Sequence, residues 1–265
     1  MTSRIDAAFA RAKAENRAAL IPFIMGGDPD AGTCAALLAA LPAAGADLIE
    51  IGMPFSDPMA DGPVIQAAGK RALEAGASVK SILKLVADFR KTNKDTPIIL
   101  MGYFNPVYRY GCEAFCRDAV QAGADGVILV DLPPEEEQEM RPYLDAGGLK
   151  LIRLIAPTSG DDRLGLLSES ASGFMYYISI TGITGAKAAD TGTLAAKLTH
   201  VREFTSLPVA VGFGIKSAAQ VGEVAPMADA VVVGSALVDI IAHNPHDAVA
   251  AASSFVTQLA AGLKR

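Results

Sequence analysis

Eight short apolar runs recur along this chain, and each is followed by a segment of helical composition. An apolar run of this kind is typical of a strand buried on both faces, and strands that alternate with helices form a parallel sheet. Eight such units within 265 residues predict a closed (β/α)₈ TIM barrel. The predicted strands cover residues 19–25, 47–51, 97–101, 126–130, 150–155, 173–179, 208–211 and 228–233.

The predicted helices exceed what a plain barrel needs. An extra helix precedes the first strand at about 2–17, the second connection holds two pieces at about 62–75 and 78–93, and a short helix opens at Gly234-Ser235. An open doubly wound sheet is the alternative, but no G-x-G-x-x-G follows the first strand. No linker or break in composition divides the chain, so we expect one domain over residues 1–265.

Composition and charge exclude several classes of partner. The net charge of −6 argues against nucleic acid and anionic membranes, and no apolar run reaches the roughly 18 residues of a membrane span. The first 20 residues indicate a charged amphipathic helix rather than a signal peptide, and the three cysteines suit reduced thiols, so we expect a cytoplasmic protein. No histidine or third cysteine lies near Cys112 and Cys116, and we expect no metal site.

The stretch from Leu48 to Pro63, LIEIGMPFSDPMADGP, carries three carboxylates in and after the second strand. Glu50 lies in the middle of an apolar strand, where burial raises the pKa of a carboxyl group and suits it to proton transfer. Asp57 and Asp61 follow in the loop. The structural alternative is that Glu50 forms a buried ion pair and that the aspartates cap the helix beginning near Pro63.

Three glycine-bearing turns follow the last predicted strands: GITGA (182–186), GFGI (212–215) and GSAL (234–237). Backbone N–H groups of such turns, and the N-terminus of a helix beginning near Ser235, bind phosphate well. A barrel places these turns at one end, although each glycine also suits an ordinary turn. No lysine lies in the C-terminal half of a strand, and Lys187 is the only reserve candidate for a Schiff base. The pattern favours acid–base chemistry by carboxylates on a phosphorylated substrate.

Longer segments carry a specific resemblance. The sequence IEIGMPFSDPMADGPVIQAA (49–68), together with PFIMGGDPD (22–30), MGYFNP (101–106), VDLPPEE (130–136), GITGA and VGFGI, resembles the tryptophan synthase alpha subunit family over nearly the whole chain. The resemblance implies a TIM barrel that acts as a lyase in tryptophan biosynthesis and cleaves indole-3-glycerol phosphate into indole and glyceraldehyde 3-phosphate. It implies no cofactor in this chain, with pyridoxal phosphate (PLP) only in a tryptophan synthase beta subunit, and an α2β2 heterotetramer.

The family's functional residues fall on particular positions of this chain. The implied catalytic residues are Glu50 and Asp61. The implied substrate-binding residues are Phe23, Met101, Ile128, Tyr176 and Thr184. The implied phosphate-binding residues are Gly185, Phe213, Gly214, Gly234 and Ser235. The implied partner contacts are Pro54, Asp57, Asn105, Pro106 and Asp131.

Two departures from the family and two alternative functions stay open at this point. Met101 stands where the family often has leucine, and the loop SITGITGAKAAD lacks the basic residue expected near Ile180. Phe23, Met101 and Ile128 would also be apolar as plain barrel core. One alternative function is another phosphosugar-binding barrel, an isomerase. The other is a weakly catalytic barrel that mainly activates a PLP-dependent partner.

Overall fold

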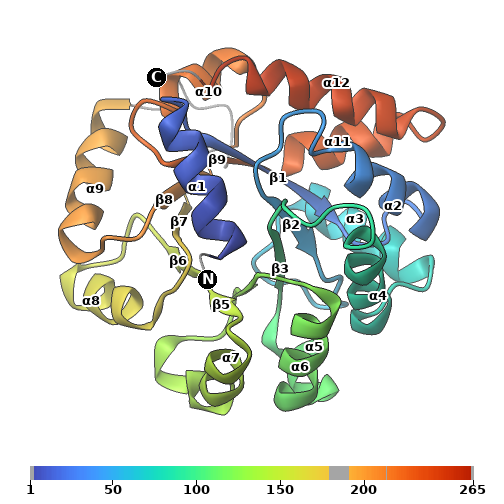
Figure 1. Cartoon of the computed structure of the whole chain (residues 1–265), viewed down its shortest axis with the longest axis horizontal. Helices are drawn as coiled ribbons and strands as arrows, with labels where there is room; N and C mark the ends of the chain where they lie inside the picture. The colour runs from blue at the N-terminus through green and yellow to red at the C-terminus, as the bar shows by residue number, and fades with distance from the viewer. Residues whose placement is uncertain (1–2, 179–190, 213, 264–265) are drawn as a thin grey trace.

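The computed structural model describes residues 3–178, 191–212 and 214–263. Their strands form one sheet of parallel neighbours in the order β5-β4-β3-β2-β1-β9-β8-β7-β6, surrounded by helices (Figure 1). This is the predicted TIM barrel. The strands are β1 (Ala19–Met25), β2 (Ile49–Gly52), β3 (Ile98–Gly102), β4 (Gly126–Leu129), β5 (Lys150–Leu151), β6 (Arg153–Ile155), β7 (Met175–Ile178), β8 (Val209–Gly212) and β9 (Ala230–Val233).

The fifth predicted strand, 150–155, is divided at Ile152 and closes the ring. Its first half pairs with β4, where Lys150 is in register with Gly126, and its second half pairs with β7. Between the two halves, the Ile152 N–H donates to the Val127 carbonyl at 3.0 Å. The segment therefore changes partner along its length, which accounts for nine strands where the sequence predicts eight.

Helices follow the strands, as the segments of helical composition indicate, with two local differences. The composition of residues 108–122 predicts one helix, but two helices cover this region, because Gly111 between them has a φ of +97°, a value that ends a regular helix. The acidic segment after β4 forms a 3₁₀ helix, η1 (Pro134–Glu139), before an α-helix begins. The α-helices are α1 (Arg4–Ala14), α2 (Ala31–Ala40), α3 (Pro63–Glu74), α4 (Val79–Phe89), α5 (Phe104–Tyr110), α6 (Cys112–Ala122), α7 (Arg141–Gly147), α8 (Asp161–Ser170), α9 (Thr191–Phe204), α10 (Ala218–Val224), α11 (Ser235–His243) and α12 (Ala248–Ala260).

Side chains alternate between two apolar layers along each strand. On β1, Leu20 and Ile24 pack with the surrounding helices in the large outer cluster, whereas Ile21 packs with the side chains that fill the barrel. This alternation follows from the two-residue period of a strand. It decides that Glu50, between the outward residues Ile49 and Ile51, faces the barrel interior.

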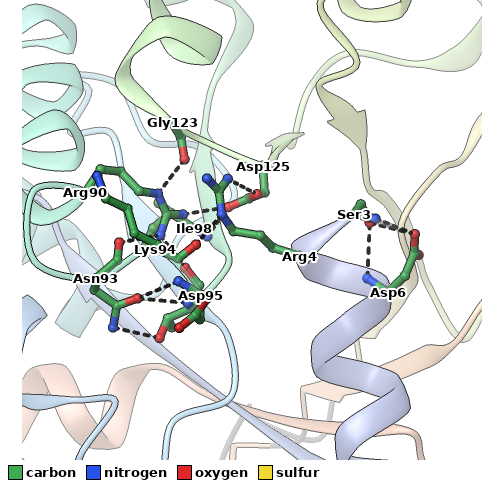
Figure 2. Close-up of polar contacts among 11 residues, drawn as sticks. Ser3, Arg4, Asp6, Arg90, Asn93, Lys94, Asp95, Ile98, Gly123 and Asp125 are labelled. Carbon is green, nitrogen blue, oxygen red and sulfur yellow. Dashed lines mark hydrogen bonds and ion pairs between the residues drawn. The ribbon is translucent and has the colours of Figure 1, made fainter. Parts of the chain in front are cut away.

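Helix α1 closes the N-terminal end of the barrel (Figure 1). Its Phe9 ring lies 5.6 Å from the ring of Phe174, which immediately precedes β7. Arg4 donates to the Asp125 carboxylate at 2.8 Å, and Arg90 binds the same carboxylate at 2.7 Å (Figure 2). This end of the barrel is therefore filled and cross-linked, which leaves the C-terminal ends of the strands for the candidate site.

Within the described ranges, none of the helices has the length and hydropathy of a membrane-spanning segment.

Candidate active site

Glu50 on β2 is an almost fully buried acid, with 1 % of its surface exposed. Neither carboxyl oxygen has a hydrogen-bond partner among the residues that the structure describes. Burial raises the pKa of Glu50 to about 8 from its ordinary 4.5, because an ionised carboxylate loses its hydration there. The ion pair considered as the structural alternative is therefore not found among these residues. A protonated carboxyl group at neutral pH can give a proton and take it back.

Phe23 lies directly beside Glu50, since the two residues are register partners on β1 and β2. Its ring occupies space that Gly52 leaves free, because a Cβ there would lie 2.6 Å from the Phe23 Cζ atom. Gly234 lies on the other side of Phe23, where an added Cβ would make an ordinary contact of 3.7 Å with the Phe23 Cβ. The predicted ring-binding residue is thus held between the strand of the acid and the turn predicted to bind phosphate.

Tyr176 on β7 faces the same interior from the other side of the barrel. Its pKa is raised well above the ordinary value by burial and then by the Glu50 charge, so the two side chains lie near each other. A Cβ on Gly212 would lie 2.6 Å from the Tyr176 hydroxyl oxygen. The missing side chain on β8 therefore makes room for the phenol ring.

Met101 and Ile128 contribute apolar surface to this interior. They are register partners on β3 and β4, and both pack in the inner cluster with Tyr176. Ile128 is buried and Met101 is half-buried. The predicted apolar slot is therefore brought together, although burial by itself suits barrel core as well.

Asp61 lies in the loop between β2 and α3 and is half-buried. Burial raises the pKa of its carboxyl group, and a hydrogen bond from the Tyr103 hydroxyl partly offsets this rise. The helix cap considered as the structural alternative is not found: Gly62 is the N-cap residue of α3, and it makes no side-chain cap. Asp57 is instead exposed and accepts a hydrogen bond from Ser56 at 2.5 Å.

Two of the predicted phosphate-binding turns lie on neighbouring strands. Gly212 on β8 is in register with Val232 on β9, so the segments that follow, with Gly214 and Gly234, leave the barrel side by side. Gly214 has a φ of +64°, and Gly234 is the N-cap residue of α11 without a side-chain cap. Ser235, the first residue of α11, is exposed. This arrangement presents backbone N–H groups as an anion site requires.

Several predicted positions lie outside the described residues: Thr184, Gly185, Lys187 and Phe213.

The predicted partner contacts follow β2, β3 and β4 at the same end of the barrel. Asp57, Asn105 and Asp131 are exposed, Pro106 is half-buried, and Pro54 is buried. Asp131 has a structural role that the sequence pattern did not indicate, because its Oδ1 atom accepts a hydrogen bond from the Phe104 N–H at 2.6 Å. It thereby caps α5 from a different loop.

The family profile described as tryptophan synthase alpha chain matches residues 9–264. The chain belongs to this family. A tryptophan synthase alpha chain of Granulibacter bethesdensis is 56 % identical over 245 residues, which cover 92 % of this chain and 88 % of that protein. The corresponding protein of Phenylobacterium zucineum is 55 % identical over 240 residues, which cover 91 % and 87 %.

Solved structures agree with this membership. The crystal structure of tryptophan synthase subunit alpha from Legionella pneumophila superposes with a TM-score of 0.92 at 39 % identity, covering 99 % of this chain and 98 % of that one. A chain of tryptophan synthase from M. tuberculosis, in an aminoacrylate-bound form, has a TM-score of 0.90 at 35 % identity, and all of both chains is covered.

Tyr103, Gly52 and Gly212 shape the site in ways that the sequence did not predict. Tyr103 directly follows β3, and that position at a strand end was the only signal that marked it. Gly212 was predicted only as part of the GFGI turn, and Gly52 gave no signal, because the space that each glycine leaves depends on which side chain lies across the barrel. In the described part of the chain, no group of three or more His, Cys, Asp or Glu side chains is arranged to hold a metal ion.

Proposed function

We propose that the chain cleaves indole-3-glycerol phosphate into indole and glyceraldehyde 3-phosphate by a retro-aldol reaction. The observation that carries this proposal is Glu50, a buried acid without a hydrogen-bond partner in the described structure and with a pKa near 8. Family membership supports the same reaction class.

The proposed reaction begins with proton transfer from Glu50 to C3 of the indole ring. This leaves a cationic, indolenine-like ring and an ionised Glu50. The Glu50 carboxylate then takes the proton of the adjacent glycerol hydroxyl as the carbon–carbon bond breaks. The electron pair of that bond returns to the indole ring. The products are indole and an aldehyde, and Glu50 ends the cycle protonated.

Asp61 is proposed to stabilise the transition state. Positive charge develops toward the ring N–H during protonation, and a carboxylate placed there interacts with the transition state more strongly than with the neutral ring. Its half-buried position in the loop between β2 and α3 is compatible with this role.

The remaining predicted residues are proposed to position the substrate. Phe23, Met101, Ile128 and Tyr176 enclose the ring, and the backbone of Gly214, Gly234 and Ser235 binds the phosphate. Anchoring the phosphate away from the reacting carbons lowers the entropic part of the barrier. Thr184, Gly185 and Phe213 stay predictions, since the structure does not describe them.

The chain is further proposed to work with a tryptophan synthase beta subunit, which holds PLP and consumes the indole. Support comes from the family and from the similarity to a chain of M. tuberculosis tryptophan synthase. The proposed contact surface contains Pro54, Asp57, Asn105, Pro106 and Asp131. The α2β2 stoichiometry and a cytoplasmic location are expectations of the same proposal.

The decisive experiment measures indole released from indole-3-glycerol phosphate by the purified chain, with and without beta subunit. The wild type should release indole, and Glu50→Gln should bind substrate but turn over roughly a thousandfold more slowly or worse. Glu223→Gln is the matched control on exposed surface of α10 and should behave as wild type. Near-normal turnover by Glu50→Gln would overturn the role of Glu50, and no indole from wild type under either condition would overturn the reaction.

A further inference from the structure

Tyr103 connects the end of β3 to the loop that carries Asp61. It lies between β3 and α5, and it contacts the loop that joins β2 to α3. Its hydroxyl oxygen accepts a hydrogen bond from the Ala60 N–H at 3.0 Å, which brings the hydroxyl next to Asp61, and this hydroxyl lowers the pKa of the Asp61 carboxyl group. Its ring lies 5.5 Å from the Phe55 ring, centroid to centroid. One side chain therefore contacts this loop near its beginning and at its end.

The backbone that carries Tyr103 is itself held in place. Met53 N–H donates to the Met101 carbonyl at 2.7 Å, which ties the start of the loop to the end of β3. The Asp131 carboxylate binds the next amide, that of Phe104, at 2.6 Å. Tyr103 thus projects from a fixed strand end toward a segment that has no regular secondary structure of its own.

Both neighbouring acids act on the Tyr103 hydroxyl. Its pKa is raised to about 12, chiefly by burial, with further contributions from the Asp61 and Asp131 carboxylates. The phenol therefore stays protonated near neutral pH and keeps its single proton as a donor. The hydroxyl oxygen accepts from the Ala60 N–H, and its proton is available to the carboxylate of the following residue, Asp61, whose pKa the hydroxyl lowers.

We propose that Tyr103 is a positioning residue for Asp61, fixing that carboxylate at the barrel mouth in its ionised form. This inference rests on the proposed function, because Asp61 is there the group that stabilises the developing ring cation. A carboxylate on an irregular loop has no fixed geometry of its own, and transition-state stabilisation requires a preorganised one. Tyr103 supplies the orientation without touching the substrate.

The first test is Tyr103→Phe, which keeps the ring and its contact with Phe55 but removes the hydroxyl. A hydrogen bond to a charged group contributes about 1.5–3 kcal/mol, which corresponds to a kcat lower by roughly ten- to hundredfold. KM should change little, since the ring slot and the phosphate turns are untouched. The acid limb of the kcat–pH profile should move to higher pH, because loss of the donor raises the pKa of Asp61. Tyr143→Phe, on the exposed side of α7, is the matched control and should equal wild type.

A double-mutant cycle separates positioning from general damage. In an Asp61→Asn background, Tyr103→Phe should cause no further loss of kcat, because the group that it orients is already altered. A loss of the same size in both backgrounds would overturn the proposal, since Tyr103 would then act independently of Asp61.

A measurement without turnover keeps this inference distinguishable from the proposed function. The Asp61 carboxyl carbon, followed by ¹³C NMR against pH, should titrate at higher pH in Tyr103→Phe than in wild type. An unchanged titration would overturn the positioning role even if the chain is confirmed as the lyase. In the wild type alone, the Ala60 amide should be protected from hydrogen exchange, and free exchange of that amide would contradict the proposal without any variant.

Discussion

At the scale of single residues, the candidate site places an acid where burial makes its charge costly. The described structure offers the Glu50 carboxylate neither a cation nor a hydrogen-bond donor. A role in folding would not favour this residue, since an apolar side chain of similar size would be more stable there. Its presence is therefore better explained by chemistry than by packing.

The free-energy cost of an ionised Glu50 in the folded protein should appear in the pH dependence of the free energy of unfolding. Below pH about 4.5 Glu50 is protonated in both the unfolded and the folded protein, so it does not oppose folding. Between about 4.5 and about 8 it ionises only when unfolded, and the wild type loses up to about 1.4 kcal/mol per pH unit from this group. Urea unfolding of wild type and Glu50→Gln should therefore diverge as pH rises from 5 to 8, with the variant gaining relative stability. A pH-independent difference would contradict this assignment.

Gly212 leaves space for the Tyr176 ring, so a side chain at this position should disturb the candidate site. An added Cβ would meet the Tyr176 hydroxyl at 2.6 Å and its Cε2 atom at 2.8 Å, so Gly212→Ala must displace a ring that faces Glu50. We expect a loss of about 1–3 kcal/mol in the free energy of unfolding and a KM raised by roughly tenfold. Gly165→Ala is the control, because nothing lies within 4 Å of its added carbon in α8. That control should keep its KM and gain up to about 1 kcal/mol.

At the scale of elements, helix α3 is fixed to the turn after β1. The Arg71 guanidinium binds the Asp28 carboxylate through two hydrogen bonds, at 2.8 and 2.9 Å. Asp28 is buried with 3 % of its surface exposed, whereas Arg71 is partly exposed on the helix. This bidentate pair therefore joins the helix that follows Asp61 to the end of the neighbouring strand.

Removing the cation should leave a buried anion without its partner. We expect Arg71→Met to lower the free energy of unfolding by about 2–4 kcal/mol, and Asp28→Asn combined with Arg71→Met to recover part of that loss. Lys70→Met is the matched control on the same helix, since Lys70 is exposed and lies 3.8 Å from Glu74, and it should cost less than about 1 kcal/mol. Chemical denaturation compares these three variants with wild type, and equal effects of Arg71→Met and Lys70→Met would contradict the role of the pair.

Strand β1 follows the sequence prediction more closely than the later elements do. The run 19–25 predicts β1 to the residue, because continuous apolar character, a following glycine pair and a proline all mark a buried strand. The break at Gly111 and the division at Ile152 were not predicted. The first depends on one backbone angle, and the second depends on which strand lies on each side.

The candidate site was likewise predicted only in part. Glu50 was predicted from its position in an apolar strand, and its burial is confirmed. The contacts of Tyr103 with Ala60, and of Tyr176 with Gly212, join residues more than 30 positions apart. Such pairs follow from strand register and loop course, which local patterns do not encode.

At the scale of the whole molecule, the two ends of the barrel differ in kind. The N-terminal end is joined by Asp125, whose carboxylate binds Arg4, Arg90 and the Ile98 N–H (Figure 2). The C-terminal end holds the glycine turns and a buried acid, Glu50, which has no hydrogen-bond partner among the described residues. Stability and chemistry are thus assigned to opposite ends, as is general for this fold.

Two variants should show that the N-terminal end of the barrel affects stability whereas the C-terminal end affects turnover. Asp125→Ala leaves Arg90 without its carboxylate partner and should lower the free energy of unfolding by about 3–5 kcal/mol, with kcat and KM within about twofold of wild type while folded. Glu50→Gln should do the opposite near pH 8, losing turnover while gaining stability. Denaturation and indole-release assays on both variants test this, and a large kcat loss in folded Asp125→Ala would show that the two ends are coupled.

The packed N-terminal end also affects the route by which reactants and products enter and leave the barrel. With α1 packed against Phe174 and Arg4 bound to Asp125, we expect reactants and products to pass through the C-terminal end of the barrel. The exposed residues Asp57, Asn105 and Asp131 follow the strands at that end. A second subunit bound to them would lie over that end, and a small apolar product leaving there would contact this subunit before it reached bulk water.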